Sequence, residues 1–588
     1  MDRKLRIGSL LLCPLFLLLS LSGCGKRGAQ AQQQAFEDFM QGAFVEAMEE
    51  DYLSAHIFLE EPAAFGVDLS QTPVQLDQPY TDRLLDEERR ALEQDAKAFA
   101  AFDRALLTPE QQDAYDAYAA QLATGLALHE EQFRYLGGAF QSISGFHTAL
   151  PNLLADLTLR SEQDVQDLIV LVEDVKPFLA SFLDYTHMQE EQGTLMVDTE
   201  DVISFCENVL APGGDSSVLR SMCEHVEALG LGAEKTQAYQ AQLREAFHSS
   251  FLPAYEEIIA AMQSLDPDKN HTGGLCTLEN GAEYYEILFR QATGSDRSVE
   301  DLQADLIQAM EDTGARAQAI AAEHPEAMDA WLADSTETGF ADYQAALAFL
   351  GEKIAPDFPA LALQPYEIAP LSAEQENASV AAYFNLPALD ATTPMQIRVN
   401  TGATGALNTL NAFSTLAHES LPGHMYQVSY AYQNVRLPWM KVAANFLAYT
   451  EGYASYVELR ALEYLEEVDP AVLELQRYWT LYNDYIVALL DIKIHYDGWT
   501  LADVNGLFGN APDDQELASF YRQIQTSPGA FLSYYVGLLQ IEALRAQAQE
   551  ALGSRYTDLG FHTALLKSGA VPFSVVERNV AAYIEEAK

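Results

Sequence analysis

Positive charge is the first thing that the sequence lacks. Its 588 residues include 33 lysines and arginines against 87 aspartates and glutamates, which gives a formal charge of −54 at neutral pH. Such an excess repels nucleic acid phosphates, so we expect no nucleic acid partner. Because the acidic residues are spread along the whole chain, they predict a solvated surface that keeps the protein soluble.

Long apolar runs are also scarce. The basic start Met1–Arg6 is followed by one almost wholly apolar run, Ile7–Leu21, which is too short to span a bilayer comfortably. A basic segment followed by an apolar segment is typical of an export signal. No later stretch is long and apolar enough for a transmembrane helix, so we expect the rest of the chain to form a folded ectodomain.

Cysteine is rare too, with 5 in the chain. Cys24 ends the stretch Leu21-Ser-Gly-Cys24, which resembles the lipobox of bacterial lipoproteins. The resemblance implies cleavage before Cys24 and a lipid on its thiol, and hence an anchor at the extracytoplasmic face of the cell membrane. The alternatives are an ordinary signal peptide with an incidental cysteine, or a buried apolar helix. Cys206 and Cys223 are a possible disulfide pair that leaves Cys276 over, and nothing in the sequence decides it.

Helical periodicity dominates the chain after the signal. We expect a signal peptide at 1–23, a glutamine-rich tether at 24–35, a helical N-terminal region at 36–360 and a metal-site region at 361–588. Apolar residues recur every three or four positions, as in the sets Val165, Leu168, Ile169, Val172, Val175 and Leu302, Leu306, Met310. Turns are expected at Pro62, Pro151-Asn152, Pro212-Gly213-Gly214 and Asp266-Pro267-Asp268.

The pattern changes between Pro365 and Asn400. Short alternating runs, Ser379–Phe384 and Met395–Asn400, predict strands of a small sheet. Helical periodicity resumes at Leu407 and continues, with interruptions, to the C-terminus. The sequence therefore predicts a mainly α protein of many helices, with a small β-sheet beside the helix that carries the motif described next.

The most informative stretch is Leu416-Ala-His418-Glu419-Ser-Leu-Pro422-Gly423-His424. Zinc peptidase helices usually carry two histidines four residues apart, with a glutamate between them. Here the histidines are six apart, which on a regular helix turns the second side chain by roughly 240° from the first. Pro422 and Gly423 are the residue types that break a helix and let His424 swing back towards His418.

A third metal ligand is expected from a neighbouring helix. Glu451 lies 27 residues after His424, enough for a turn and an antiparallel return. Two imidazoles and one carboxylate leave one position of a tetrahedral zinc open for water, whose proton Glu419 could take as the water attacks a carbonyl carbon. Glu419 could then protonate the leaving amine. The alternative is that Pro422-Gly423 only separates two helices and that hydrogen bonds satisfy both histidines.

The motif also resembles a known family. His418-Glu-Ser-Leu-Pro-Gly-His424, followed by Tyr449-Thr-Glu451-Gly-Tyr-Ala454, is similar to the HExxPGH and EGWA motifs of the bacterial DUF885 family, whose members look like distant relatives of gluzincin metallopeptidases. Tyr453 stands where that family commonly has tryptophan, which leaves Glu451 in place. Further similar stretches are Asn280–Tyr285, Ala381–Pro387, Ile397–Asn400, Ser533–Gly537, Gly553 and Phe561–Gly569.

This resemblance implies a mainly helical, metallopeptidase-like fold. It also implies one Zn²⁺ ion on His418, His424 and Glu451, with Glu419 as the general acid and base. Peptide hydrolysis through an oxyanion needs hydrogen-bond donors besides the metal, and Tyr534 and His562 are the preferred candidates. Their alternative roles are core packing for Tyr534 and a helix-surface hydrogen bond for His562.

Three further residues are candidates for substrate contacts. Arg545 would meet a substrate carboxylate, or else pair with one of the many acids. His495, four residues after Asp491, would contact substrate or orient a ligand, although a structural hydrogen bond is the default. Asn400 ends the strand that precedes the metal-binding helix and would clamp the backbone of an extended peptide.

We therefore expect zinc-dependent hydrolysis of peptide bonds in extracytoplasmic peptides. A second possibility keeps the metal but assigns another amide or ester, for instance in material derived from the cell wall. A third is a solute-binding lipoprotein with a structural or vestigial zinc site. The intact Glu419 argues against a vestigial site, because a set of ligands alone would not need it.

Overall fold

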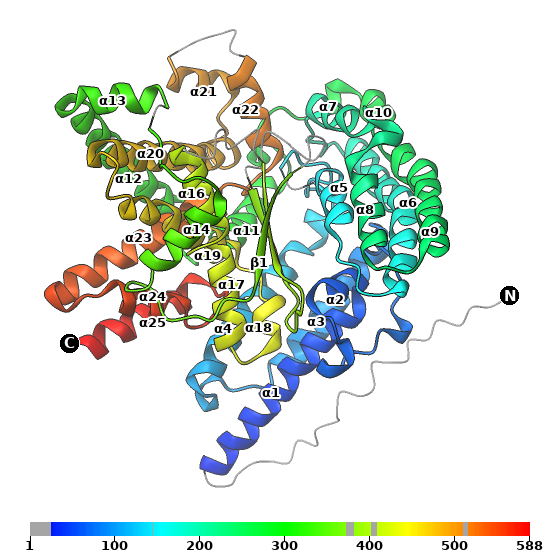
Figure 1. Cartoon of the computed structure of the whole chain (residues 1–588), viewed down its shortest axis with the longest axis horizontal. Coiled ribbons are helices and arrows are strands. Elements are labelled where there is room, and N and C mark those ends of the chain that lie inside the picture. Colours follow the sequence, from blue (N-terminus) through cyan, green and yellow to red (C-terminus); the bar gives the residue numbers. More distant parts are fainter. Residues whose placement is uncertain (1–24, 144, 335, 372–381, 401–408, 510–514) are drawn as a thin grey trace.

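The described part of the first half of the chain is mainly helical, as its three- and four-residue apolar spacing predicts (Figure 1). The computed structural model describes residues 25–588 except 144, 335, 372–381, 401–408 and 510–514. The helices up to the sheet are α1 (Gly25–Glu50), α2 (Tyr52–Phe58), α3 (Asp82–Phe99), α4 (Pro109–Leu128), α5 (Phe146–Asp156), α6 (Glu162–Gln192), α7 (Thr199–Leu210), α8 (Ser217–Ala228), α9 (Ala233–Ala246), α10 (Leu252–Ser264), α11 (Gly281–Thr293), α12 (Val299–Glu323), α13 (Pro325–Leu332) and α14 (Tyr343–Lys353).

Three strands and a second set of helices follow. The strands are β1 (Tyr366–Pro370), β2 (Ala382–Asn385) and β3 (Met395–Val399). The helices after them are α16 (Leu410–Glu419), α17 (His424–Asn434), α18 (Pro438–Val442), α19 (Leu447–Ala461), α20 (Pro470–His495), α21 (Leu501–Leu507), α22 (Gln515–Thr526), α23 (Leu532–Leu552), α24 (Asp558–Leu566) and α25 (Phe573–Ala587). The mainly helical fold with a small sheet is thus confirmed.

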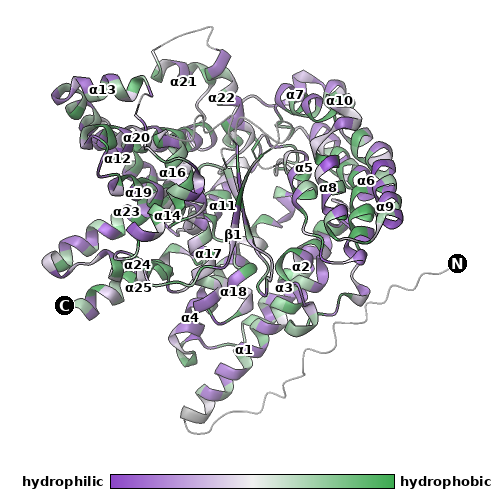
Figure 2. Ribbon diagram, in the orientation of Figure 1, coloured by the Kyte–Doolittle hydropathy of each residue, from purple (hydrophilic) through white to green (hydrophobic). Residues whose placement is uncertain are grey.

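Most helices are amphipathic, and Figure 2 shows hydrophilic and hydrophobic residues along the same helices. Helix α6 illustrates the cause: Ser161 and Asp164 form a capping box at its start, and its predicted apolar set is buried. Gly193, in the left-handed conformation at φ 73°, ends the helix. Within the described residues, no helix has the length and apolar character that crossing a membrane would require.

One expected turn is wrong. Pro151 lies inside α5 instead of between two helices. A proline there cannot donate a hydrogen bond to the carbonyl of His147, one turn back. The hydroxyl of Tyr255 on α10 donates to that carbonyl at 2.8 Å, so a tertiary contact replaces the missing helical bond. The turns expected at 212–214 and 266–268 do separate helices.

The helices build two main hydrophobic cores. The larger core contains residues from Phe36 to Ile584, including side chains of α1, α4, α11 and α12 together with those of α16–α20 and α23–α25. The second core is built mostly by residues 140–265 on α5–α10. Figure 1 shows α5–α10 grouped on one side of the sheet and the C-terminal helices on the other. Cys206 and Cys223 are buried in the second core as free thiols, so they form no disulfide here.

Two of the expected boundaries lie within continuous structural units, one within the larger core and one within α1. The pattern change near residue 361 marks the start of the sheet, whereas helices before and after it share one core. Residues 25–35 of the expected tether belong to α1, which is helical from Gly25. Phe36 and Met40, just beyond that segment, are fully buried and hold α1 in the larger core.

The sheet has the order β1-β3-β2. Strand β1, which the sequence did not predict, runs parallel to β3, with Tyr366 opposite Met395. Strand β2 runs antiparallel to β3, with Ala382 opposite Val399. Residues in β3 alternate between buried and half-buried, as a strand with one face on the core requires. Strand β3 is therefore the middle strand and β2 is an edge strand.

Candidate metal centre

A break between two helices brings the two motif histidines together. Helix α16 ends at Glu419, and α17 begins at His424 after a four-residue turn with a cis bond between Leu421 and Pro422. The amide of Gly423 donates to the carbonyl of Ala417 at 3.0 Å, so the turn folds back onto the last turn of α16. The predicted helix break at Pro422-Gly423 is confirmed.

Glycine is required at position 423. A Cβ atom there would lie 1.8 Å from the carbonyl oxygen of His418 and 2.4 Å from that of Ala417. Backbone atoms inside a helix cannot move away by that much without breaking its hydrogen bonds. The absence of a side chain thus allows the close approach that starts α17, with His424 as its first residue, beside the end of α16.

His418, His424 and Glu451 converge. The Nε2 atom of His424 lies 3.2 Å from Oε2 of Glu451, and the Nε2 atom of His418 lies 3.6 Å from the same oxygen. The two rings are 4.8 Å apart and nearly perpendicular, at 81°. One ligand atom from each residue lies within 4.8 Å of the others, the one such group of three among the described residues. We call these three residues the candidate metal centre.

The electrostatics of this group suit a cation. Burial opposes ionisation of Glu451, but the two histidines hold the pKa of its carboxyl well below the usual range. Burial likewise opposes charge on His424, yet the carboxylates of Glu451 and Glu419 raise its pKa. The group therefore stabilises positive charge in a buried place, and two imidazoles with one carboxylate form a donor set that fits zinc.

Glu419 lies next to the metal centre and contacts the sheet. Its carboxylate is 4.0 Å from Nε2 of His418, and its side chain is buried. Burial raises the pKa of Glu419, while a hydrogen bond donated by the backbone N–H of Phe384 in β2 favours its charged form. Since β2 pairs with β3 along one side, this N–H points from the other side of the strand towards the metal centre.

The role expected for Asn400 needs correction. Asn400 was expected to clamp the backbone of an extended peptide lying beside the strand that it ends. That strand, β3, is flanked by β1 and β2, so both of its edges are already paired. Asn400 follows it and is buried, with 2% of its surface exposed. The edge that reaches the metal centre belongs to β2.

Tyr534 is brought to the centre by a close helix crossing. Helices α19 and α23 cross at two glycines, and a Cβ atom on Gly452 would lie 2.5 Å from Cα of Gly537. This crossing places Tyr534 beside Glu451, the neighbour of Gly452. The ring of Tyr534 stacks 6.3 Å from that of His418. Burial and the charges of Glu451 and Glu419 raise the pKa of its hydroxyl, which also hydrogen-bonds Glu451, so the hydroxyl stays protonated.

Sequence reasoning missed Glu458. Its Oε2 atom accepts a hydrogen bond from Nδ1 of His418 at 2.7 Å. Glu458 follows Glu451 by seven residues, about two helical turns, so both carboxylates lie on one face of α19. That spacing was a usable signal, because a metal-binding histidine usually donates its second nitrogen to a carboxylate or a carbonyl.

His562, expected as a catalytic hydrogen-bond donor, makes its hydrogen bonds to groups other than the three residues of the candidate metal centre. Its Nδ1 donates to the carbonyl of Asp357 at 2.7 Å, and its Nε2 accepts from the hydroxyl of Tyr456 at 3.0 Å. The ring stacks on Phe358 at 3.9 Å and is almost fully buried. Burial lowers its pKa to about 4, so the ring is neutral and both nitrogens are occupied.

His495 and Arg545, expected as substrate contacts, are also engaged with other parts of the chain. His495 is fully buried: Nε2 donates to the carbonyl of Ile524, and Nδ1 accepts from the amide of Leu275, each at 3.1 Å. Arg545 pairs with Asp558 at 3.0 Å. The alternatives, a structural hydrogen bond for His495 and an ion pair for Arg545, are the ones confirmed.

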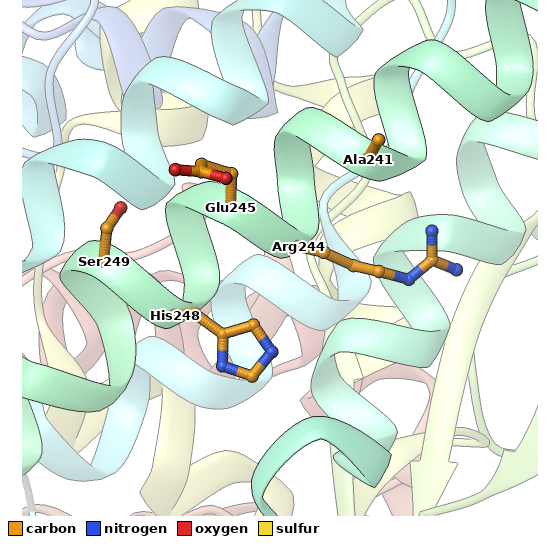
Figure 3. Close-up of a pocket in the computed structure, with 5 residues that line it drawn as sticks. All are labelled: Ala241, Arg244, Glu245, His248 and Ser249. Carbon is orange, nitrogen blue, oxygen red and sulfur yellow. The ribbon is translucent and has the colours of Figure 1, made fainter.

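A surface hollow elsewhere offers no comparable set of ligands. It has a volume of about 390 Å³ and lies along α9 and the following π-helix, Phe247–Phe251 (Figure 3). Figure 3 shows its side chains fanning out from one helical segment instead of converging. The lining residues, all exposed, are Ala241, Arg244, Glu245, His248 and Ser249.

Comparison with solved structures supports the fold. A proposed lipoprotein from Colwellia psychrerythraea is 19% identical with a TM-score of 0.80, and the match covers 94% of this chain and 99% of that chain. A proposed lipoprotein of unknown function from Shewanella oneidensis is 16% identical with a TM-score of 0.62, covering 92% and 98%. A proposed oligoendopeptidase F from Bacillus anthracis is 12% identical and covers 87% and 96%, but its TM-score of 0.30 is too low to support any argument.

Comparison with families and curated proteins gives one match. No curated protein matches the chain. The family model that matches is described as a bacterial protein of unknown function, DUF885, and the match covers residues 64–580. This range includes the candidate metal centre, Glu419 and Tyr534. The chain therefore belongs to the DUF885 family.

Proposed function

We propose that the protein is a zinc-dependent peptidase that acts outside the cytoplasm. The observation that carries the proposal is the convergence of His418, His424 and Glu451, with Glu419 beside them. A purely structural zinc site is usually closed by a fourth protein ligand, whereas this group offers three ligands and a nearby carboxylate. That difference favours catalysis over a structural role.

The three ligand residues would hold the ion through Nε2 of each histidine and a carboxylate oxygen of Glu451. When bound, zinc would supply a Lewis acid that polarises a carbonyl and makes water acidic near neutral pH. Glu458 fixes His418 for this role: with the Nδ1 proton donated to Glu458, the lone pair of Nε2 faces Glu451 and His424.

The remaining steps belong to two residues of the chain. Glu419 takes the proton of the attacking water and passes it to the leaving amine, and the amide of Phe384 keeps its carboxylate oriented. The hydroxyl of Tyr534 donates a hydrogen bond to the oxygen that gains negative charge during the attack. Its protonated state and its place beside Glu451 suit that task.

Peptides are the substrate that the sheet favours. Strand β2 is one of the two edge strands in the described part of the sheet, and its Phe384 amide reaches Glu419. An extended peptide laid along this edge would gain backbone hydrogen bonds while one of its carbonyls lies near the metal centre. Esters or isolated amides would make fewer of these contacts.

We further propose a lipid on Cys24 and location at the extracytoplasmic face of the cell membrane. Cys24 lies outside the described residues, so the support comes from the lipobox-like stretch Leu21-Ser-Gly-Cys24. The names of the structural relatives from Colwellia psychrerythraea and Shewanella oneidensis, both proposed lipoproteins, agree with this proposal.

Replacing Glu419 tests the proposed chemistry. Glu419→Gln should retain zinc but lower kcat for a mixed peptide library by about 10²–10⁴-fold, because the amide cannot accept the proton of water. Zinc content is measured by mass spectrometry of the metal, and cleavage by mass spectrometry of the peptides. Glu245→Gln, an exposed control, should change neither quantity. Undiminished cleavage by Glu419→Gln would remove Glu419 from the mechanism.

A further inference from the structure

We propose that α1 is a rigid strut that holds the protein on the membrane in one orientation, with the N-terminal end of α1 facing the lipid head groups. The inference rests on the lipid at Cys24, which is part of the proposed function, but it does not depend on peptide hydrolysis. The partner is therefore a bilayer surface, and four properties of α1 support the assignment.

The first property is the absence of a spacer. Helix α1 begins at Gly25, the residue directly after Cys24. It contains 26 residues, which corresponds to a length of about 39 Å. A lipid on Cys24 would therefore be joined to a helix at once, whereas a flexible linker would let the anchored body turn freely.

The second property is that the larger core fixes the direction of α1. Phe36, Met40, Phe44 and Met48 follow one another at four-residue spacing and are 0–3% exposed. Phe36 also packs edge-on against Phe102 at 5.4 Å between ring centroids. Because these contacts bury one face of α1 over several turns, the helix cannot swing relative to the rest of the molecule.

The third property is that hydrogen bonds clamp α1 close to its start. Gln32 accepts from the amide of Asp103 at 3.0 Å, and Gln33 donates to the carbonyl of Leu106 at 2.9 Å. About two turns, residues 25–31, precede these clamps, a length of roughly 10 Å. Figure 1 shows this end of α1 projecting beyond the neighbouring helices.

The fourth property is charge. Lys26 and Arg27 follow Cys24 closely in the sequence, and Glu37 is the first acidic residue after Cys24. The start of α1 is therefore basic, and anionic lipids attract basic residues near a membrane anchor. The rest of the chain is strongly acidic and is repelled by the same lipids. A projection of roughly 10 Å exceeds the Debye length of about 8 Å at physiological ionic strength, so the acidic body stands where the repulsion is largely screened.

The test uses the full lipidated chain on vesicles of phosphatidylcholine with phosphatidylglycerol. A photo-reactive amino acid is placed at Gln30, which is exposed near the start of α1, or at Leu332, which is 65% exposed on α13. Figure 1 places α13 at the far side of the molecule from the free end of α1. We expect several-fold more crosslinks to phospholipid from Gln30 than from Leu332. Equal crosslinking from both positions would overturn the proposal.

A linker insertion separates rigidity from anchoring. Eight glycine and serine residues between Cys24 and Gly25 should leave the protein on the vesicles but abolish most of the difference between the two positions. The same insert after Gly230, in the turn between α8 and α9, should leave the difference intact. Cys24→Ala should release the chain into solution, and retention would refute the lipid premise. None of these outcomes depends on hydrolysis, so failure of the strut and failure of the peptidase proposal are distinguishable.

Discussion

At the scale of single residues, Glu458 controls how His418 presents its Nε2 atom to the candidate metal centre. Glu458→Gln keeps an acceptor for the Nδ1 proton but removes the negative charge, and Glu458→Ala removes both. We expect zinc affinity to fall by about 10-fold to 100-fold, with the larger loss in Glu458→Ala. Competition with a chromophoric chelator measures the affinity, and Glu245→Gln is the control. Unchanged affinity in Glu458→Ala would show that His418 needs no partner.

The buried carboxyl of Asp491 should make the free energy of unfolding depend on pH. It is fully buried and accepts hydrogen bonds from the hydroxyl of Tyr285 at 2.6 Å and the amide of Gly529 at 2.8 Å. Burial nevertheless raises its pKa from 3.8 to about 7. Between about pH 4 and pH 7, the folded protein therefore keeps the carboxyl of Asp491 protonated, whereas the unfolded chain has lost that proton. The resulting stabilisation is complete below about pH 4 and is lost as pH rises towards 7.

Asp491→Asn should remove this dependence. The free energy of unfolding of the native protein, minus that of the variant, should fall by about 1.4 kcal/mol per pH unit between about pH 4 and pH 7. Denaturant unfolding at a series of pH values measures the difference. Parallel curves for the two proteins would mean that the carboxyl of Asp491 keeps an ordinary pKa in the folded state.

The convergence of the candidate metal ligands could be predicted from sequence because they form a dense pattern. His418, Glu419 and His424 lie within seven residues, and the proline-glycine pair explains their spacing. His562 and His495 could not be excluded in the same way. A histidine in a helical segment looks the same whether its ring meets a substrate or a backbone carbonyl, and only tertiary packing supplies the carbonyls of Asp357 and Ile524.

At the scale of elements, the turn between α16 and α17 sets the geometry of the metal centre. Gly423→Ala forces a methyl group against the carbonyl of His418, so either the turn or the end of α16 must shift. We expect a loss of about 1–3 kcal/mol in the free energy of unfolding, as for other overpacked sites, together with weaker zinc binding. Chemical denaturation and chelator competition measure the two effects.

Gly42→Ala is the matched control for this substitution. Gly42 lies within α1, and a Cβ atom there would meet nothing within 4 Å. Alanine favours a helix over glycine by up to about 1 kcal/mol, so this variant should be as stable as the native protein or slightly more stable. If Gly423→Ala behaved like Gly42→Ala in both assays, the close approach at the turn would not matter to the centre.

The sequence predicted the helices and strands better than it predicted how they are arranged. The alternation in 395–399 and 382–384 correctly predicted β3 and part of β2, because one face of β3 is buried. Such short patterns do not show which strand lies in the middle of the sheet. The peptide was therefore expected beside β3, although β2 is an edge strand and β3 is not. Pro151 was likewise assigned to a turn, since the hydroxyl of Tyr255 that compensates for it comes from about a hundred residues away.

At the scale of the whole molecule, charge repulsion should limit stability. Even if all 33 cationic side chains paired with acids, 54 acidic side chains would remain unpaired. Raising the salt concentration from about 10 mM to about 150 mM shortens the Debye length from about 30 Å to about 8 Å, which screens this repulsion. We expect Tm to rise by several degrees, measured by calorimetry with sodium chloride and with choline chloride. A fall in Tm would mean that salt weakens attractive pairs more than it relieves repulsion.

The arrangement of the two cores was beyond the sequence pattern. Apolar periodicity shows that a helix has a buried face but not which helices share that face. Helix α1 and the C-terminal helices belong to one core although hundreds of residues separate them, and α5–α10 form another between them. The sequence showed one change of pattern, at the start of the sheet, and this change lies within the larger core and does not separate the two cores.

The most direct test of the proposed function is metal analysis of the purified full chain together with a peptide-library digest, with and without a chelator. We predict about one zinc ion per chain and cleavage that stops on chelation and returns when zinc is added back. His424→Ala should lose both the metal and the cleavage. A chain that binds no metal, or cleavage that continues unchanged in the chelator and in His424→Ala, would contradict the assignment of a zinc peptidase.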